Sequence, residues 1–261
     1  MPVRRLAELT KDQMAACTGD VLVLPLGSTE QHGPHLAMGT DTLLAAEVAE
    51  TATAELDDRV GVVLAPSLPY GISGHHVFAG AASVRAETYQ RWVMELLQSL
   101  ADSGFARFFL LNGHGGNHDS LSVVAKTAPL DLGVSVAVCS YWNTVVGQLD
   151  DLGAVDVPGH AGMFETSLVL AVRPDLVDMS RAPSTTADPP AVWASPPHPG
   201  LEVQLPGEWP RVGGYSDASA GADAALGRDV RTRVCTQVTR AIERFVALCD
   251  GRGAGGGAAH D

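Results

Sequence analysis

The order of apolar segments constrains the fold of this chain more than any other feature of its sequence. Four short apolar runs are expected to be strands: residues 21–27, 60–65, 107–111 and 134–139. The first of them has the composition of a strand buried on both faces. Two segments between them have the spacing of amphipathic helices, residues 41–56 and 86–103, and a third helix is expected over residues 118–128. Strands that alternate with helices predict an α/β fold, with a mostly parallel sheet covered by helices on both faces.

The second half of the chain continues with helices and a long irregular segment. Residues 160–172 and 222–248 are expected to be helical, and residues 182–220, rich in Pro, Ser and Gly, are expected to form an extended loop. We expect residues 1–250 to form one domain, because no segment has the composition of a linker. The Gly- and Ala-rich tail, residues 251–261, is expected to be disordered.

The charge balance argues against two classes of partner. The chain has 17 Lys and Arg residues against 30 Asp and Glu residues, a formal net charge of −13. Proteins that bind nucleic acid or anionic membranes need a surplus of basic residues, so we expect neither partner. No stretch reaches the roughly 18 consecutive apolar residues of a membrane span. Residues 1–13 also lack the apolar core of a signal peptide, so we expect a cytoplasmic location.

Acidic residues and histidines follow the first predicted strand. Glu30 and His32 are two residues apart in a loop, and Asp41 begins the next helix. Carboxylate and imidazole together are ligands for Zn²⁺, Mn²⁺ or Fe²⁺, and one carboxylate can bridge two such ions. We therefore predict a metal site with Asp41 as the bridge. The alternative is a polar loop whose residues merely cap a helix.

A glycine-rich loop, Asn-Gly-His-Gly-Gly-Asn, directly follows the third predicted strand. It places His114 at the same edge of the sheet as the first loop, since parallel strands end on the same side. A phosphate site on the following helix is the alternative. However, the loop lacks both a GxGxxG pattern and a Lys-Ser/Thr pair after its glycines.

The segment from Gly159 to Ser167 contains an acid within an otherwise apolar helical pattern. A buried carboxylate such as Glu165 needs a partner. A metal ion would be such a partner, and a salt bridge to a buried arginine is the alternative. His160 precedes the predicted helix and is better placed for proton transfer than for packing.

Other residues are candidates for the wall of a substrate pocket. His75 and His76 lie in the loop after the second predicted strand, and Trp142 follows the fourth. Trp193 and Trp209 lie in the predicted long loop and are further candidates to cover a pocket. Surface histidines and ordinary hydrophobic anchors are the alternatives for these five residues.

Together these motifs resemble the creatininase (creatinine amidohydrolase) family over roughly residues 5–250. The resemblance rests on residues 27–33 (GSTEQHG), Asp41, residues 112–117 (NGHGGN) and residues 160–167 (HAGMFETS), which occur in the family's order. It implies a three-layer α/β/α sandwich, a homo-oligomer that is commonly a hexamer, and two divalent metal ions. These ions are usually Zn²⁺ or Mn²⁺, with Fe²⁺ in some relatives.

The resemblance also assigns roles to individual residues. Carried over by position, the metal ligands are Glu30, His32, Asp41 and His114, and His160 is the proton shuttle. Creatininases proper carry a Glu where this chain has Gly116, and we place Glu165 among both the metal ligands and the catalytic residues as its candidate replacement. This departure argues against creatinine as the substrate.

The function implied is hydrolysis of a non-peptide C–N bond in a small cyclic amide or formamide by a metal-bound hydroxide. Two alternatives stay open. One is a metallopeptidase that trims a small peptide precursor, of the mycofactocin type, although the chain has Gly74-His75-His76 where Gly-Glu-His is expected in that peptidase. The other is a non-catalytic metal- or ligand-binding protein on the same fold.

Overall fold

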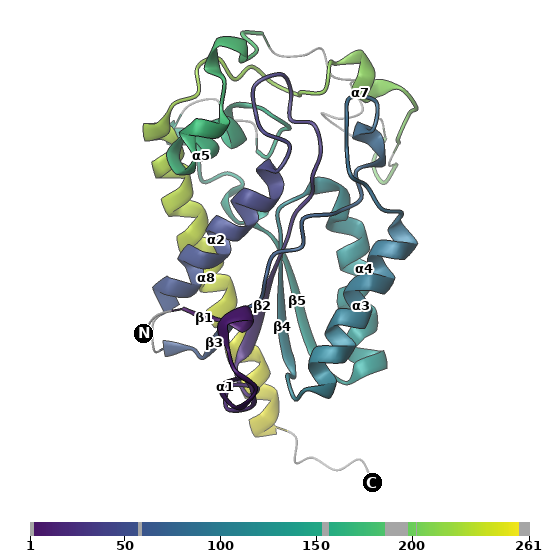
Figure 1. Cartoon of the computed structure of the whole chain (residues 1–261), viewed down its shortest axis with the longest axis vertical. Helices are drawn as coiled ribbons and strands as arrows, with labels where there is room; N and C mark the ends of the chain where they lie inside the picture. Colours follow the sequence, from purple (N-terminus) through teal and green to yellow (C-terminus); the bar gives the residue numbers. More distant parts are fainter. Residues whose placement is uncertain (1–2, 57–58, 153–156, 186–197, 202, 256–261) are drawn as a thin grey trace.

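A parallel β-sheet forms the centre of the molecule in the computed structural model (Figure 1). The structure describes residues 3–56, 59–152, 157–185, 198–201 and 203–255. Within these residues the sheet has five strands in the order β1-β3-β2-β4-β5, and every neighbouring pair is parallel. The strands are β1 (Arg4–Arg5), β2 (Val21–Leu26), β3 (Val62–Leu64), β4 (Arg107–Asn112) and β5 (Ser135–Ser140).

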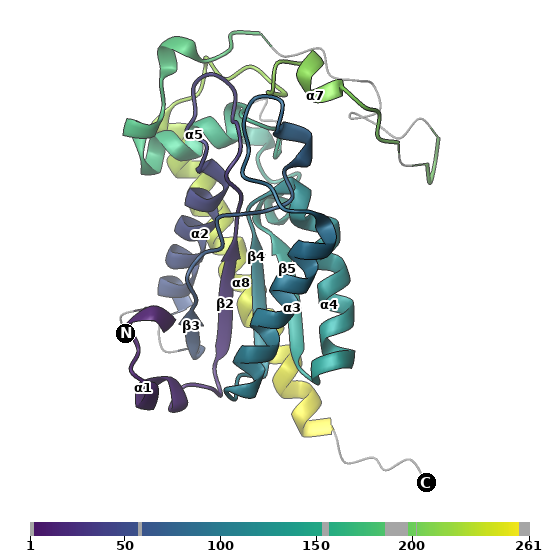
Figure 2. The same ribbon diagram turned by 45° about the vertical axis from the view of Figure 1, so that its right-hand side comes forward.

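Helices cover both faces of the sheet. On one face lie α2 (Thr40–Leu56) and α8 (Ala224–Gly255), and α5 (Met163–Val172) packs against both of them. On the other face lie α3 (Ala86–Asp102) and α4 (His118–Leu132), which pack together (Figures 1 and 2). The predicted α/β class and three-layer α/β/α sandwich are therefore confirmed.

The alternation of side chains along β2 and β4 explains why these strands are continuously apolar. Val23 and Phe109 belong to the core under α2 and α8, whereas Leu24 and Phe108 belong to the core under α3 and α4. All six residues of β2 are buried. A strand covered on both faces has no solvent-facing positions, so it needs apolar residues throughout.

The helix α3 shows the opposite pattern, with one buried stripe. Tyr89, Val93 and Leu97 recur every four residues and are fully buried, while charged residues such as Arg91 and Glu95 face solvent. This spacing is the one that predicts an amphipathic helix packed on a sheet.

Several predicted boundaries are wrong by a few residues. The helix predicted from residue 160 begins at Met163, because Gly159 and Ala161 have φ angles of +59° and +53°, which a right-handed helix does not allow. The last helix continues to Gly255, beyond the predicted start of the tail at 251, and residues 256–261 lie outside the described residues.

Some elements were not predicted at all. The edge strand β1 and the short helix α1 (Lys11–Ala15) precede the first predicted strand. The short helix α7 (Glu208–Arg211) lies within the predicted loop 182–220. Residues 186–197 of that loop, including Trp193, lie outside the described residues.

The strands' carboxyl ends and the loops that follow them occupy the upper part of the molecule in Figure 1. The segments after β2, β3, β4 and β5 carry most of the predicted site residues, as expected for a parallel sheet, and Asp41 and Glu165 lie in the first turns of α2 and α5. None of the helices that the structure describes combines the length and apolar character needed to cross a bilayer.

Candidate metal centre

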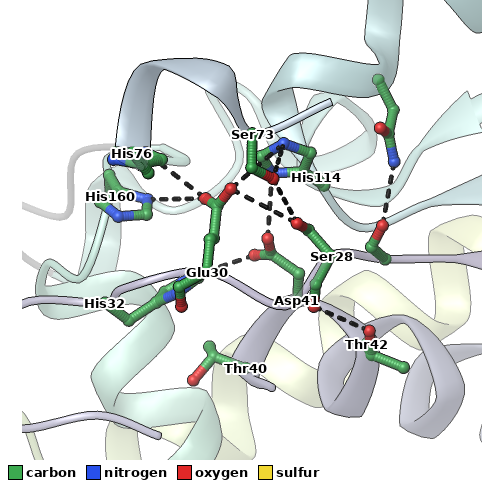
Figure 3. Close-up of polar contacts among 12 residues, drawn as sticks. Ser28, Glu30, His32, Thr40, Asp41, Thr42, Ser73, His76, His114 and His160 are labelled. Atoms are coloured by element: carbon green, nitrogen blue, oxygen red, sulfur yellow. Dashed lines mark hydrogen bonds and ion pairs between the residues drawn. The ribbon is translucent and has the colours of Figure 1, made fainter. Parts of the chain in front are cut away.

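The predicted ligands come from separate parts of the chain and meet above the sheet. Glu30 and His32 lie in the loop after β2, and His114 follows β4. Asp41 and Glu165 lie in the first turns of α2 and α5. All five side chains are buried. Figure 3 shows Glu30, Asp41 and His114 directed toward one another.

The first group of possible ligands consists of Glu30, Asp41 and His114. Their ligand atoms lie within 4.8 Å of one another. Nδ1 of His114 lies 2.9 Å from Oδ2 of Asp41, and Nε2 of His114 lies 3.4 Å from Oε2 of Glu30. Two carboxylates and one imidazole suit a divalent ion such as Zn²⁺ or Mn²⁺.

The second group consists of His32, Asp41 and Glu165. Nε2 of His32 lies 3.0 Å from Oδ1 of Asp41 and 3.9 Å from Oε2 of Glu165. Asp41 therefore belongs to both groups, with one oxygen facing His32 and the other facing His114. In the described part of the chain the ion-pair partner of Glu165 is His32 and not an arginine.

Backbone carbonyls orient the two candidate ligand histidines. Nδ1 of His32 lies 3.1 Å from the carbonyl oxygen of Glu30, and Nε2 of His114 lies 3.1 Å from that of Ile72. A carbonyl only accepts, so these ring nitrogens carry the proton. The other nitrogen of each ring faces Asp41. Burial lowers the pKa values of both rings, but Asp41 outweighs it and raises them above the ordinary value. In the neutral ring that nitrogen is bare and available to an ion, as in ligand histidines whose far N–H is held by the protein.

The charges of the cluster fit a bound cation. Oε1 of Glu30 and Oδ2 of Asp41 are buried and have no hydrogen-bond partner among the described residues. Burial raises the pKa values of Glu30 and Glu165 above their ordinary values. Burial also opposes ionisation of Asp41, but His32 and His114 outweigh it and hold the pKa of Asp41 below its usual range. Three buried carboxylates this close together need positive charge, which divalent ions supply.

His160 lies beside the ligand groups and is itself held by the backbone. Its Nε2 donates to the carbonyl oxygen of Gln31 at 2.9 Å, so its Nδ1 is bare and lies 3.8 Å from Oε1 of Glu30. Burial, together with the neighbouring rings of His32 and His76, holds the pKa of His160 well below its ordinary value. His160 also forms a possible ligand group with Glu30 and His32, so geometry alone permits either a proton-transfer or a ligand role.

A cavity of about 560 Å³ opens over the metal-ligand candidates. The predicted substrate residues His75, His76 and Trp142 all line it. Trp142 and His76 are buried, whereas His75 is exposed at the surface. Glu30, His75 and His76 form one more possible ligand group.

Two further residues lie beside the cavity, Trp209 and Gln31. The sequence only weakly indicated Trp209 and did not indicate Gln31. The ring centroid of Trp209 lies 4.5 Å from that of His76 and 5.2 Å from that of His160, so this residue lies against the site instead of anchoring a distant loop. Gln31 was not singled out, although its side chain contacts His76 and its backbone contacts His160. Its place between Glu30 and His32 was the available signal.

Gly116 leaves no room for a ligand side chain. A Cβ atom there would lie 2.2 Å from the carbonyl oxygen of Ile72 and 2.6 Å from Nε2 of His114. These are the two atoms that form the hydrogen bond orienting His114. Position 116 therefore has no room for the Glu that the resemblance implies for creatininases proper, and Glu165 is the carboxylate that lies near His32 and Asp41 instead.

We expect Gly116→Ala to weaken metal binding by about 10- to 100-fold, because it forces apart the hydrogen bond that orients a ligand. Competition with a calibrated chelator measures this affinity. Gly115→Ala is the matched control, since a Cβ at Gly115 meets no atom within 4 Å. Equal metal affinity in the two variants would contradict the role given to the contact between His114 and Ile72.

Comparison with known proteins places these features in one family. Residues 7–242 match the creatininase family, described as creatinine amidohydrolase. The chain is 34% identical to creatinine amidohydrolase from Pseudomonas putida over 240 residues, which cover 83% of this chain and 88% of that protein. It is 32% identical to a mycofactocin precursor peptide peptidase from Mycobacterium tuberculosis over 270 residues, covering 95% and 94% of the two chains.

Solved structures agree with this assignment. A crystal structure of creatinine amidohydrolase is similar with a TM-score of 0.76 at 29% identity, covering 94% of this chain and 98% of that one. Another creatininase structure, described as containing Mn, has a TM-score of 0.75 at 30% identity and covers 93% and 99% of the two chains. A creatininase variant described as Zn-Zn type has a TM-score of 0.76 at 30% identity and covers 94% and 99%.

Proposed function

The chain belongs to the creatininase family, and on that premise we propose that it is a two-metal amidohydrolase acting on a non-peptide C–N bond of a small molecule. The bond would lie in a cyclic amide or a formamide. That the protein is a hydrolase of this family rests on the family match and on the buried His, Glu and Asp groups. The proposal adds to this the substrate class, a small cyclic amide or formamide.

The observation that carries the two-metal proposal is the shared position of Asp41. Its two oxygens face different histidines, and a different glutamate completes each group. Glu30, His114 and Asp41 would hold one ion, and His32, Glu165 and Asp41 the other. When bound, such ions polarise a carbonyl group and lower the pKa of a water molecule toward neutrality.

The remaining step of hydrolysis is a proton transfer, and we assign it to His160. Water adds its oxygen to the carbonyl carbon, and the proton it loses must reach the nitrogen as the C–N bond breaks. The bare Nδ1 of His160 faces the cavity beside Glu30 and is able to accept this proton and deliver it to the leaving nitrogen.

The volume of the cavity and the residues that line it favour a small substrate. Its volume of about 560 Å³ lies within the usual range for small-molecule sites. Trp142 lines it from the segment after β5, and Leu205 and Trp209 line it from the segment before and within α7. These side chains supply apolar surface to the cavity wall, which suits the apolar parts of a small substrate. We assign substrate contacts to His75, His76 and Trp142.

Trimming of a small peptide precursor is the second candidate function. The alignment with the Mycobacterium tuberculosis peptidase covers 95% of this chain, more than the 83% covered by the Pseudomonas putida creatinine amidohydrolase. The two activities would use the same metal groups and differ in what the cavity admits. The homo-oligomer implied by the family, commonly a hexamer, stays a prediction.

We expect purified protein to contain two divalent ions per chain and to lose hydrolysis when they are chelated. Elemental analysis gives the stoichiometry, and mass spectrometry follows a panel of lactams, hydantoins, formamides and short peptides. Activity on the first three classes that returns with Zn²⁺ or Mn²⁺ supports the proposal, whereas activity on peptides alone supports the second candidate. Full activity of metal-free protein would contradict both.

A further inference from the structure

We propose that Gln31 fixes His76 as the tautomer with its proton on Nε2, so that His76 is a hydrogen-bond donor to an acceptor oxygen of the substrate and not a metal ligand. The substrate contact in this inference rests on the proposed function. The tautomer of His76, and whether His76 binds a metal ion, can be measured on the protein without a substrate. Gln31 is then a positioning residue that acts through His76.

The position of His76 makes both roles geometrically available. Its ring lines the cavity, and its Nε2 lies 3.4 Å from Oε1 of Glu30. A dashed line marks this contact in Figure 3. It belongs to a group with Glu30 and His75 whose ligand atoms lie within 4.8 Å of one another. Residue types and distances therefore do not distinguish a ligand from a donor, but the hydrogen bond on the far side of the ring does.

The amide of Gln31 supplies that hydrogen bond, and its orientation is set by the backbone. The N–H of Gly33 donates to Oε1 of Gln31 at 3.0 Å, which leaves the amide nitrogen on the other side. This nitrogen lies 2.8 Å from Nδ1 of His76. An amide nitrogen only donates, so Nδ1 must accept and is bare. In the neutral ring the proton is then on Nε2, the nitrogen that faces Glu30.

The ligand histidines show the reverse arrangement. The far nitrogens of His32 and His114 face backbone carbonyls, so these carry the protons, and in the neutral rings the nitrogens near Asp41 are bare and available to an ion. A metal binds a bare nitrogen. By the same rule, Nε2 of His76 carries a proton and is unable to bind an ion while the Gln31 amide keeps its orientation.

Gln31 thereby gives two stacked rings opposite roles. Its backbone carbonyl accepts from Nε2 of His160 at 2.9 Å, and its side-chain amide donates to Nδ1 of His76. The amide nitrogen also lies 3.1 Å from Nε2 of His160, but that ring nitrogen already donates to the closer carbonyl. The two ring centroids are 4.2 Å apart with an interplanar angle of 16°.

The resulting pair matches the chemistry of an amide. Nε2 of His76 presents a donor and Nδ1 of His160 presents an acceptor, and both lie beside the same oxygen of Glu30. An amide has an oxygen that accepts and a nitrogen that needs a proton as its bond to carbon breaks. His76 therefore donates to the oxygen, on which negative charge develops during attack, while His160 serves the nitrogen.

The direct test is the tautomer of His76 in the zinc-loaded protein. Solid-state ¹⁵N NMR of histidine-labelled protein distinguishes bare from protonated ring nitrogens, and the His76→Gln spectrum identifies the signals of His76 by their loss. We expect a bare Nδ1 and a protonated Nε2. Gln31→Glu should invert this pattern, because a carboxylate accepts from Nδ1. Gln90→Met, a change on α3 away from the site, should leave it unaltered. A bare Nε2 in the unaltered protein would overturn the proposal.

Metal content and turnover give the second test. His76→Ala should keep two ions per chain and lose about 10²-fold in kcat, the usual effect of removing one oxyanion donor. His76→Gln, which retains an N–H near the position of Nε2, should stay within tenfold of the unaltered protein. Loss of an ion from either variant would show that His76 is a ligand. If no substrate is found, the proposed function fails, whereas the NMR and metal measurements still decide the role of His76.

Discussion

Asp41→Ala is expected to release both metal ions and to lower kcat/KM by roughly 10⁴-fold or more, on the scale of removing an essential catalytic group. The reason is that Asp41 is the one residue shared by the Glu30–His114 and the His32–Glu165 groups among the described residues. Without it each group keeps a single imidazole and a single carboxylate, too few protein ligands to hold a catalytic ion firmly.

The number of ions released makes this prediction specific. His114→Ala removes a ligand from one group only, so it should release one ion and abolish turnover, while the ion between His32 and Glu165 remains. Elemental analysis after gel filtration counts the ions. Thermal unfolding with and without added Zn²⁺ gives an independent readout, because an ion that binds only the folded state raises Tm.

A matched control is available on the surface. Asp131 lies exposed on α4, outside every ligand group found in the described residues, and Asp131→Ala should keep two ions and full activity. Retention of one ion by Asp41→Ala would show that the two groups do not depend on a common carboxylate. Such a result would remove the main support for a two-metal centre.

His160→Ala is expected to keep both ions and to lower kcat by about 10²- to 10⁴-fold, the usual contribution of general acid–base catalysis. The bare Nδ1 beside Glu30 is the group removed. Because His160 also lies within reach of Glu30 and His32 as a possible ligand, metal content decides between the roles. Release of an ion from this variant would identify His160 as a ligand.

The pH dependence follows from the same residue. Burial and neighbouring histidines hold the pKa of His160 below its ordinary value, so the ring is neutral and able to accept a proton near neutral pH. Activity that depends on neutral His160 is lost only as the pH falls through this lowered pKa. We therefore expect the acid limb of the kcat profile to lie below the ordinary histidine pKa of about 6.5, and His160→Ala to lack that limb.

The part of the cavity beside His75 and His114 is where we expect substrate specificity to be determined. His75 occupies a position where the related peptidases are expected to carry Glu, and its ring lies parallel to that of His114 with centroids 5.9 Å apart. Gly116, on the other side of this contact, admits no side chain. On the resemblance to the family, we therefore expect the cavity of this chain to differ from that of creatininases proper beside the metal groups.

The sequence alone was sufficient for the fold class and for the set of candidate ligands. Continuous apolar runs predicted β2 and β4 because strands buried on both faces have no polar positions. Glu30, His32, Asp41 and His114 could be brought to one place from the sequence, since loops that follow parallel strands leave the sheet at one edge. Glu165 was singled out because a carboxylate in an apolar helix needs a partner.

Only the tertiary structure decided how these residues are paired and protonated. Asp217, 54 residues away from Met163, accepts from the backbone N–H of Met163 and helps to set where α5 begins. Trp209 reaches the cavity from a distant segment, and the amide of Gln31 selects the protonated nitrogen of His76. Such contacts join residues far apart in sequence or depend on the orientation of a single side chain, so neither composition nor periodicity records them.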